Sequence, residues 1–91
     1  MRILHMSRVM KTLGRSADLR NADLAGAVLE SVKLQGANLR GAGLWEANLE
    51  GTELQGAKGL TLEQVESAQY NDNTKFPPHI EEALGRNKKT T

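Results

Sequence analysis

Residues 16–60 read SADLR NADLA GAVLE SVKLQ GANLR GAGLW EANLE GTELQ GAKGL when they are written in groups of five. The fourth place is leucine in eight consecutive groups, the second is alanine in seven of the nine, and the first is glycine in five of the nine. The eight leucines are Leu19, Leu24, Leu29, Leu34, Leu39, Leu44, Leu49 and Leu54. Spacing kept over this length indicates a repeat architecture, in which each unit packs against the next.

A period of five fits neither a continuous helix nor a straight strand. On a helix successive leucines would move around the cylinder, and on a straight strand an odd period would place them on alternate faces. The chain must therefore turn once in every group. Glycine, asparagine and serine tolerate tight turns and left-handed dihedrals, so we predict a corner at the first place. In the extended remainder, the second and fourth side chains point inward and the third and fifth point outward.

Four such corners, each of about a right angle, close a coil of 20 residues, and successive coils stack at the strand spacing of about 4.8 Å. Residues 20 apart then lie one above the other, so that the leucines form internal columns. The sequence predicts an all-β solenoid, a square β-helix of about two coils over residues 15–60. A leucine-rich helical bundle would need apolar residues at i, i+3, i+4 and i+7, which this segment lacks.

Tandem A(D/N)LxG-like units of this kind resemble the pentapeptide-repeat family, and the resemblance covers residues 16–60, about half of the chain. The following stretch, GLTLEQVESAQYNDNTKFP (residues 59–77), is similar to a run common after the last coil in bacterial members. The resemblance implies a right-handed quadrilateral β-helix. Val32 and Thr52 replace alanine at places that would stack, which predicts a slightly wider interior there. Gly43 and Glu46 are also unusual at their places.

The apolar column of a short solenoid is open at both ends, so we expect capping segments. For the C-terminal cap, residues 61–85, we expect a first short helix with Thr61 as N-cap and Gln64 completing a capping box. A second short helix is expected in PHIEEALG, residues 78–85, and Phe76 is expected to plug the column.

In residues 1–14, apolar side chains at helical spacing predict an amphipathic, basic helix. These side chains are Ile3, Met6, Met10 and Leu13. The helix could cover the first coil, form a seam between two copies, or contact an anionic membrane or nucleic acid. The polar residues 86–91 are expected to be a disordered tail.

Composition argues against most catalytic and metal chemistry. The absence of cysteine excludes a disulfide scaffold and a thiolate metal or redox site. His5 and His79 lie far apart with no partner at metal-ligand spacing, and no serine stands in a nucleophile motif. We therefore expect no enzyme activity, no metal and no cofactor. No segment has the roughly 20 apolar residues of a membrane span, so a cytoplasmic protein is expected.

Charge is nearly balanced over the whole chain, with a net value of +1. Residues 1–15 carry four bases and no acid, whereas residues 16–60 carry four bases and six acids. Some members of the resembled family imitate DNA and bind DNA gyrase, but that role needs a long, strongly acidic rod. Two coils only about 10 Å tall with a charge of −2 make this the weaker alternative. No nucleic-acid partner is expected.

The outward places supply the candidate partner-binding residues Trp45, Arg20 and Arg40. The coil model stacks Arg20 below Arg40, Glu30 below Glu50, and Ala25 below Trp45. The like-charged pairs could be a binding feature, or their repulsion could be tolerated or offset by acids such as Asp18. Trp45 is a typical contact anchor, although residues 1–14 or a second copy could cover it. We predict a non-catalytic structural or protein-interaction module, with another protein as partner or a homodimer through an end cap or the Trp45 face.

Overall fold

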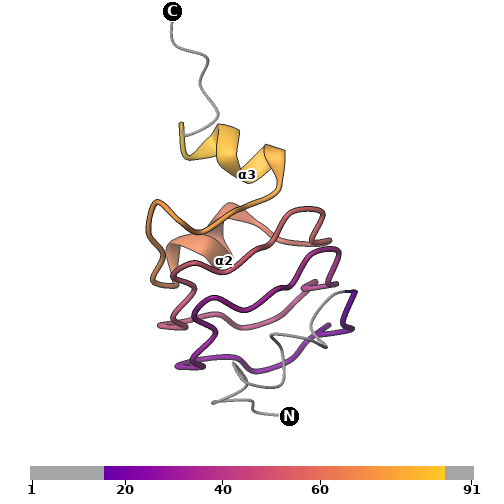
Figure 1. The fold of residues 1–91 in the computed structure, drawn as a ribbon. Coiled ribbons are helices and arrows are strands. Elements are labelled where there is room, and N and C mark those ends of the chain that lie inside the picture. The colour runs from indigo at the N-terminus through magenta and orange to yellow at the C-terminus, as the bar shows by residue number, and fades with distance from the viewer. Residues whose placement is uncertain (1–15, 86–91) are drawn as a thin grey trace, which may run out of the picture.

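The computed structural model describes residues 16–85, and all structural statements below concern these residues. The helix expected in residues 1–14 and the tail expected in residues 86–91 lie outside them. Residues 16–60 wind into stacked coils of a β-helix-type solenoid (Figure 1). Third-place residues form parallel bridges with partners 20 positions later, as in Asp18 with Asn38 and Asn38 with Lys58. Each bridge is isolated because a corner bounds the extended segment on both sides.

The predicted corners are confirmed, because every first-place residue from 16 to 56 has a left-handed φ between 57° and 73°. Five of these residues are glycines, and the others are Ser16, Asn21, Ser31 and Glu46. The turns from residue 21 to residue 56 are also hydrogen-bonded, as where the Ala27 N–H donates to the Leu24 carbonyl oxygen over 2.9 Å. Only glycine adopts this conformation without steric cost, so the four other corners are held by the hydrogen bonds around them.

Ser31→Gly is therefore expected to raise the free energy of unfolding by about 0.5–1 kcal/mol, because it removes a left-handed non-glycine residue (φ 60°). Ser31 is exposed, so little packing is lost. Denaturant unfolding followed by circular dichroism measures the change. Ser31→Ala is the control, since it keeps the strained conformation and should bring no gain. A lower stability for the glycine variant would contradict the interpretation.

The core consists of the inward second and fourth places. All eight repeat leucines are buried, and the neighbouring second places are filled mainly by buried alanines. Thr52 is also fully buried, and its Oγ1 donates a hydrogen bond of 2.7 Å to the carbonyl oxygen of Leu29 in the coil below. Thr74 repeats this arrangement one level higher, with its Oγ1 2.7 Å from the Leu49 carbonyl oxygen. Both buried threonine side chains are thus hydrogen-bonded, which offsets the cost of burying them.

Helix α2 (Leu62–Glu66) and helix α3 (Pro78–Ala83) lie at the same end of the stacked coils (Figure 1). The predicted capping box is confirmed, since Thr61 accepts from the Gln64 N–H while Gln64 accepts from the Thr61 N–H. The same glutamine also donates its amide to the carbonyl oxygens of Leu39 and Ala42, over 3.0 and 2.9 Å. The Gln64 side chain therefore caps the N-terminus of α2 and also holds that helix to the carbonyl groups of the coil below.

Beyond Gly59 the chain keeps pairing with the coil below, but at longer spacing. Asn48 pairs with Gln69 and Glu53 pairs with Lys75, offsets of 21 and 22 residues. This register places Tyr70 above Leu49 and Phe76 above Leu54. The two rings contact edge to face, with centroids 5.3 Å apart and planes at 86°.

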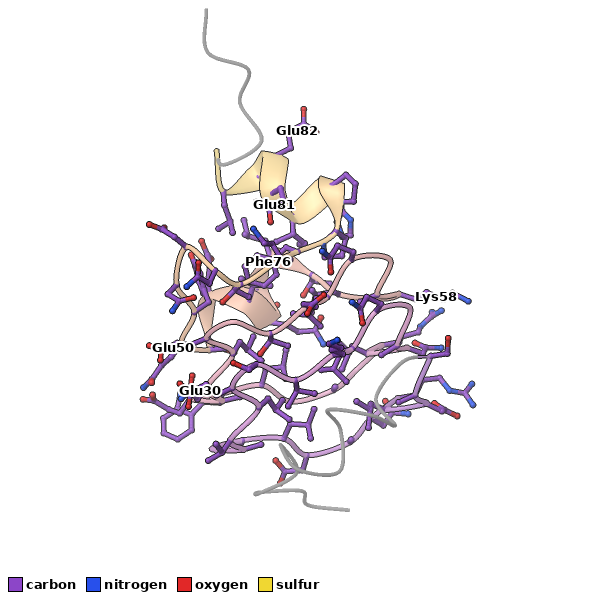
Figure 2. The ribbon with its side chains drawn as sticks, viewed as in Figure 1. Glu30, Glu50, Lys58, Phe76, Glu81 and Glu82 are labelled. Atoms are coloured by element: carbon purple, nitrogen blue, oxygen red, sulfur yellow. The ribbon has the colours of Figure 1, made fainter. Side chains whose placement is uncertain are left out.

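Phe76 itself is only 3% exposed. Figure 2 shows it beneath α3, with Glu81 directed toward it and Glu82 directed away from the coils. The Phe76 N–H donates to Glu81 Oε2 over 2.9 Å.

Candidate interaction surface

One flat face of the solenoid contains the large exposed apolar side chain of the described residues. We call this the Trp face; it comprises residues 21–25 and 41–45, between the corners at residues 21 and 41 and those at 26 and 46. Trp45 is 65% exposed and is the single large hydrophobic residue exposed in residues 16–85. A single exposed apolar residue is common on protein surfaces, but tryptophan is enriched among the residues that contribute most to binding at protein interfaces.

The backbone that carries Trp45 is held on both sides. Its carbonyl oxygen accepts from the Gly26 N–H over 2.9 Å, and the next N–H, that of Glu46, donates to the Ser67 carbonyl oxygen over 2.7 Å. Beside it in the face is Gly43, where an added Cβ would meet nothing within 4 Å. The indole thus stands on a fixed backbone next to an open, flat surface, so little backbone entropy would be lost when a partner covers it.

The opposite edge of the Trp face carries Arg20 and Arg40. Arg20 pairs with Asp18 through two contacts of 2.9 Å, Nε to Oδ1 and Nη2 to Oδ2. These hydrogen bonds lower the pKa of Asp18 to about 2, so the pair stays ionised over the usual working range. Within residues 16–85 this is the only ion pair, and Arg40 has no carboxylate at that distance. Of the two stacked arginines, Arg40 is therefore the cation that is not neutralised.

Arg40 also borders an open cavity of about 410 Å³. Its lining consists of Arg40, Gly41, Ala42, Gly59, Thr61 and Gln64. The polar groups of Thr61 and Gln64 are already engaged in the capping box and the coil carbonyls. The guanidinium of Arg40 is thus the charged group that this part of the surface offers to another molecule.

One acidic residue, Glu46, lies at the Trp edge of the face. Glu46 is exposed at the corner next to Trp45, and its Oε1 accepts from Gln69 Nε2 over 3.1 Å. On the neighbouring face Glu30 and Glu50 lie one above the other, on the side opposite Lys58 (Figure 2). The Trp face therefore has a basic edge at Arg40 and an acidic edge at Glu46.

The described residues include one histidine, His79. His79 Nε2 lies 2.9 Å from the Leu60 carbonyl oxygen, which fixes the imidazole against the backbone. Residues 16–85 contain no group of three or more histidines, cysteines or acids placed to hold a metal ion. No helix in this range is long and apolar enough to cross a membrane.

The structure brings the predicted residues Trp45, Arg20 and Arg40 to the two edges of one face. Sequence reasoning did not include Glu46, because it was seen only as an unusual corner residue. Its position next to Trp45, at the exposed first place of a group, could have indicated that it borders the same surface. Tyr70 was also missed, because the register change after Gly59 does not follow from the repeat.

A family model described as pentapeptide repeats matches residues 15–45 and 33–58, with eight copies of the repeat. A comparison with curated proteins gives no match. The matched residues include the whole Trp face and both arginines.

Proposed function

The chain belongs to the pentapeptide-repeat family through residues 15–58, and from this premise we propose that it is a non-catalytic interaction module whose Trp face binds a protein partner. Its framework is a right-handed, square β-helix of about two coils. Helices α2 and α3 close one end of the column, with Phe76 beneath α3 (Figure 2). A framework of this kind keeps flat faces in place without any change of shape on binding.

The observation that carries this proposal is the 65% exposure of Trp45 in a fold whose other large apolar residues in the range 16–85 are buried or partly buried. Tryptophan and arginine are enriched among the residues that dominate the energetics of protein interfaces; the Trp face carries Trp45, and Arg40 borders it. A buried indole contributes a large contact area, and Arg40 can pair with a carboxylate of the partner. The repeat residues supply no comparable arrangement for a small substrate.

Trp45→Ala is expected to reduce the recovery of a partner in affinity capture from the source cell at least tenfold, because a tryptophan that becomes buried in an interface contributes about 2 kcal/mol or more to binding. Arg40→Glu is expected to act in the same direction. Gln55→Ala is the matched control, since Gln55 occupies the same exposed place of a pentad on another face. Equal recovery with all of these variants would show that the Trp face is not the binding surface.

A further inference from the structure

We infer that the partner of the Trp face is a second copy of this chain, packed face to face about a two-fold axis parallel to the coil axis. This inference rests on the function proposed above and names its partner. It starts from the charges at the two edges of the face. The cation Arg40 and the anion Glu46 lie on the same level, at the two consecutive corners that bound the Trp face. Residues 41–45 lie between them.

A two-fold axis parallel to the coil axis places each edge of the face against the opposite edge of the other copy. Arg40 of one copy then lies against Trp45 and Glu46 of the second, and the same pair forms a second time by symmetry. A guanidinium over an indole is a favourable cation–π arrangement, and the adjacent carboxylate completes an ion pair. The face is thus complementary to itself in both charge and apolar contact.

The flatness of the face agrees with this arrangement. Gly43 puts no side chain between the two edges at the upper level and has open space where one would stand, and Ala25 below Trp45 is small. The alternative two-fold axis, which runs along the face but perpendicular to the coil axis, would bring Arg20 against Arg40 and is disfavoured by like charge. The small area of two coils places the dimer among weak, transient complexes.

One residue opposes association. Asp23 lies in the middle of the lower level, where the axis brings it near its own copy, although its Oδ1 is turned back to accept the Ala25 N–H over 3.1 Å. Asn38 and Asn48 make the same bond to the N–H two residues later. Asp23→Asn therefore keeps the local structure and removes a like-charge contact, so we expect dimerisation to become roughly two- to fivefold tighter.

Sedimentation velocity of the purified full chain, from roughly 10 μM to 1 mM, measures the association expected for a small interface. Trp45 is the only tryptophan, so its fluorescence should shift to shorter wavelength as the dimer forms. Arg40→Glu and Glu46→Arg should each weaken association by roughly tenfold or more, since each places two like-charged pairs in the dimer. An equimolar mixture of the two variants should restore it, because both contacts become attractive again in the mixed dimer.

Lys75→Glu is the control, since it makes the same change of charge at an exposed position on the opposite face. It should leave association unchanged. A chain that stays monomeric, association that persists in both charge variants, or a mixture that fails to recover would overturn the inference. The proposed function would survive these results if Trp45→Ala still abolished capture of a different protein, so the two failures can be told apart.

Discussion

Phe76→Ala is expected to lower the free energy of unfolding by about 2–4 kcal/mol, as for the loss of a buried ring. Phe76 is 3% exposed, takes the place above Leu54, and contacts the Tyr70 ring edge to face. Alanine would leave a cavity where the column meets α3 and would remove the aromatic contact. Thermal and denaturant unfolding of the natural chain and the variant measure the loss.

Phe76→Leu is the matched control, because it continues the column with the residue that fills it below. Its loss should be clearly smaller than that of the alanine variant, since most of the buried volume is kept. A Phe76→Ala chain as stable as the natural one would mean that this ring does not fill the end of the core.

Gly59→Ala is expected to cost about 2–4 kcal/mol, the sum of a strained dihedral and a steric clash. Gly59 has a φ of 74°, and an added Cβ would lie 2.7 Å from both Cα and Cβ of Arg40. Backbone atoms of the coil below cannot move aside as a flexible side chain would. The substitution should therefore push the last pentad away from Arg40 and disturb the register that follows.

Gly26→Ala separates the two contributions, because Gly26 has almost the same φ of 72° but nothing within 4 Å of the added Cβ. It should cost only about 1 kcal/mol, the strain of the left-handed conformation alone. Unfolding curves for both variants provide the comparison. Equal losses would show that the contact of Gly59 with Arg40 does not matter for stability.

Much of the central fold followed from local pattern. Leucine at the fourth place of each five-residue group, with alanine two residues earlier, predicts which side chains are buried, since an extended segment places them on the same side. The corners at Ser31 and Glu46 were predicted although neither is glycine, because their position in the repeat outweighs their own preference. The capping box of Thr61 and Gln64 was also predicted, since it depends on residues only three apart.

The candidate surface was only partly predictable. Trp45, Arg20 and Arg40 could be placed as outward residues from the spacing alone. The spacing could not predict which of the two arginines is neutralised, because Asp18 could have paired with either guanidinium. The acidic edge at Glu46 needs the orientation of a corner side chain, which its place in the repeat does not determine.

The sequence by itself determined the coil, the corners and the columns, because a five-residue repeat imposes the same local geometry on every unit. Only the tertiary structure decided how the repeat ends. Gly59 turns against the Arg40 backbone, Leu60 is buried one residue later than the repeat expects, and Tyr70 and Phe76 succeed the leucines at offsets of 21 and 22 residues. Those offsets depend on contacts between segments more than 20 residues apart, and no local pattern encodes them.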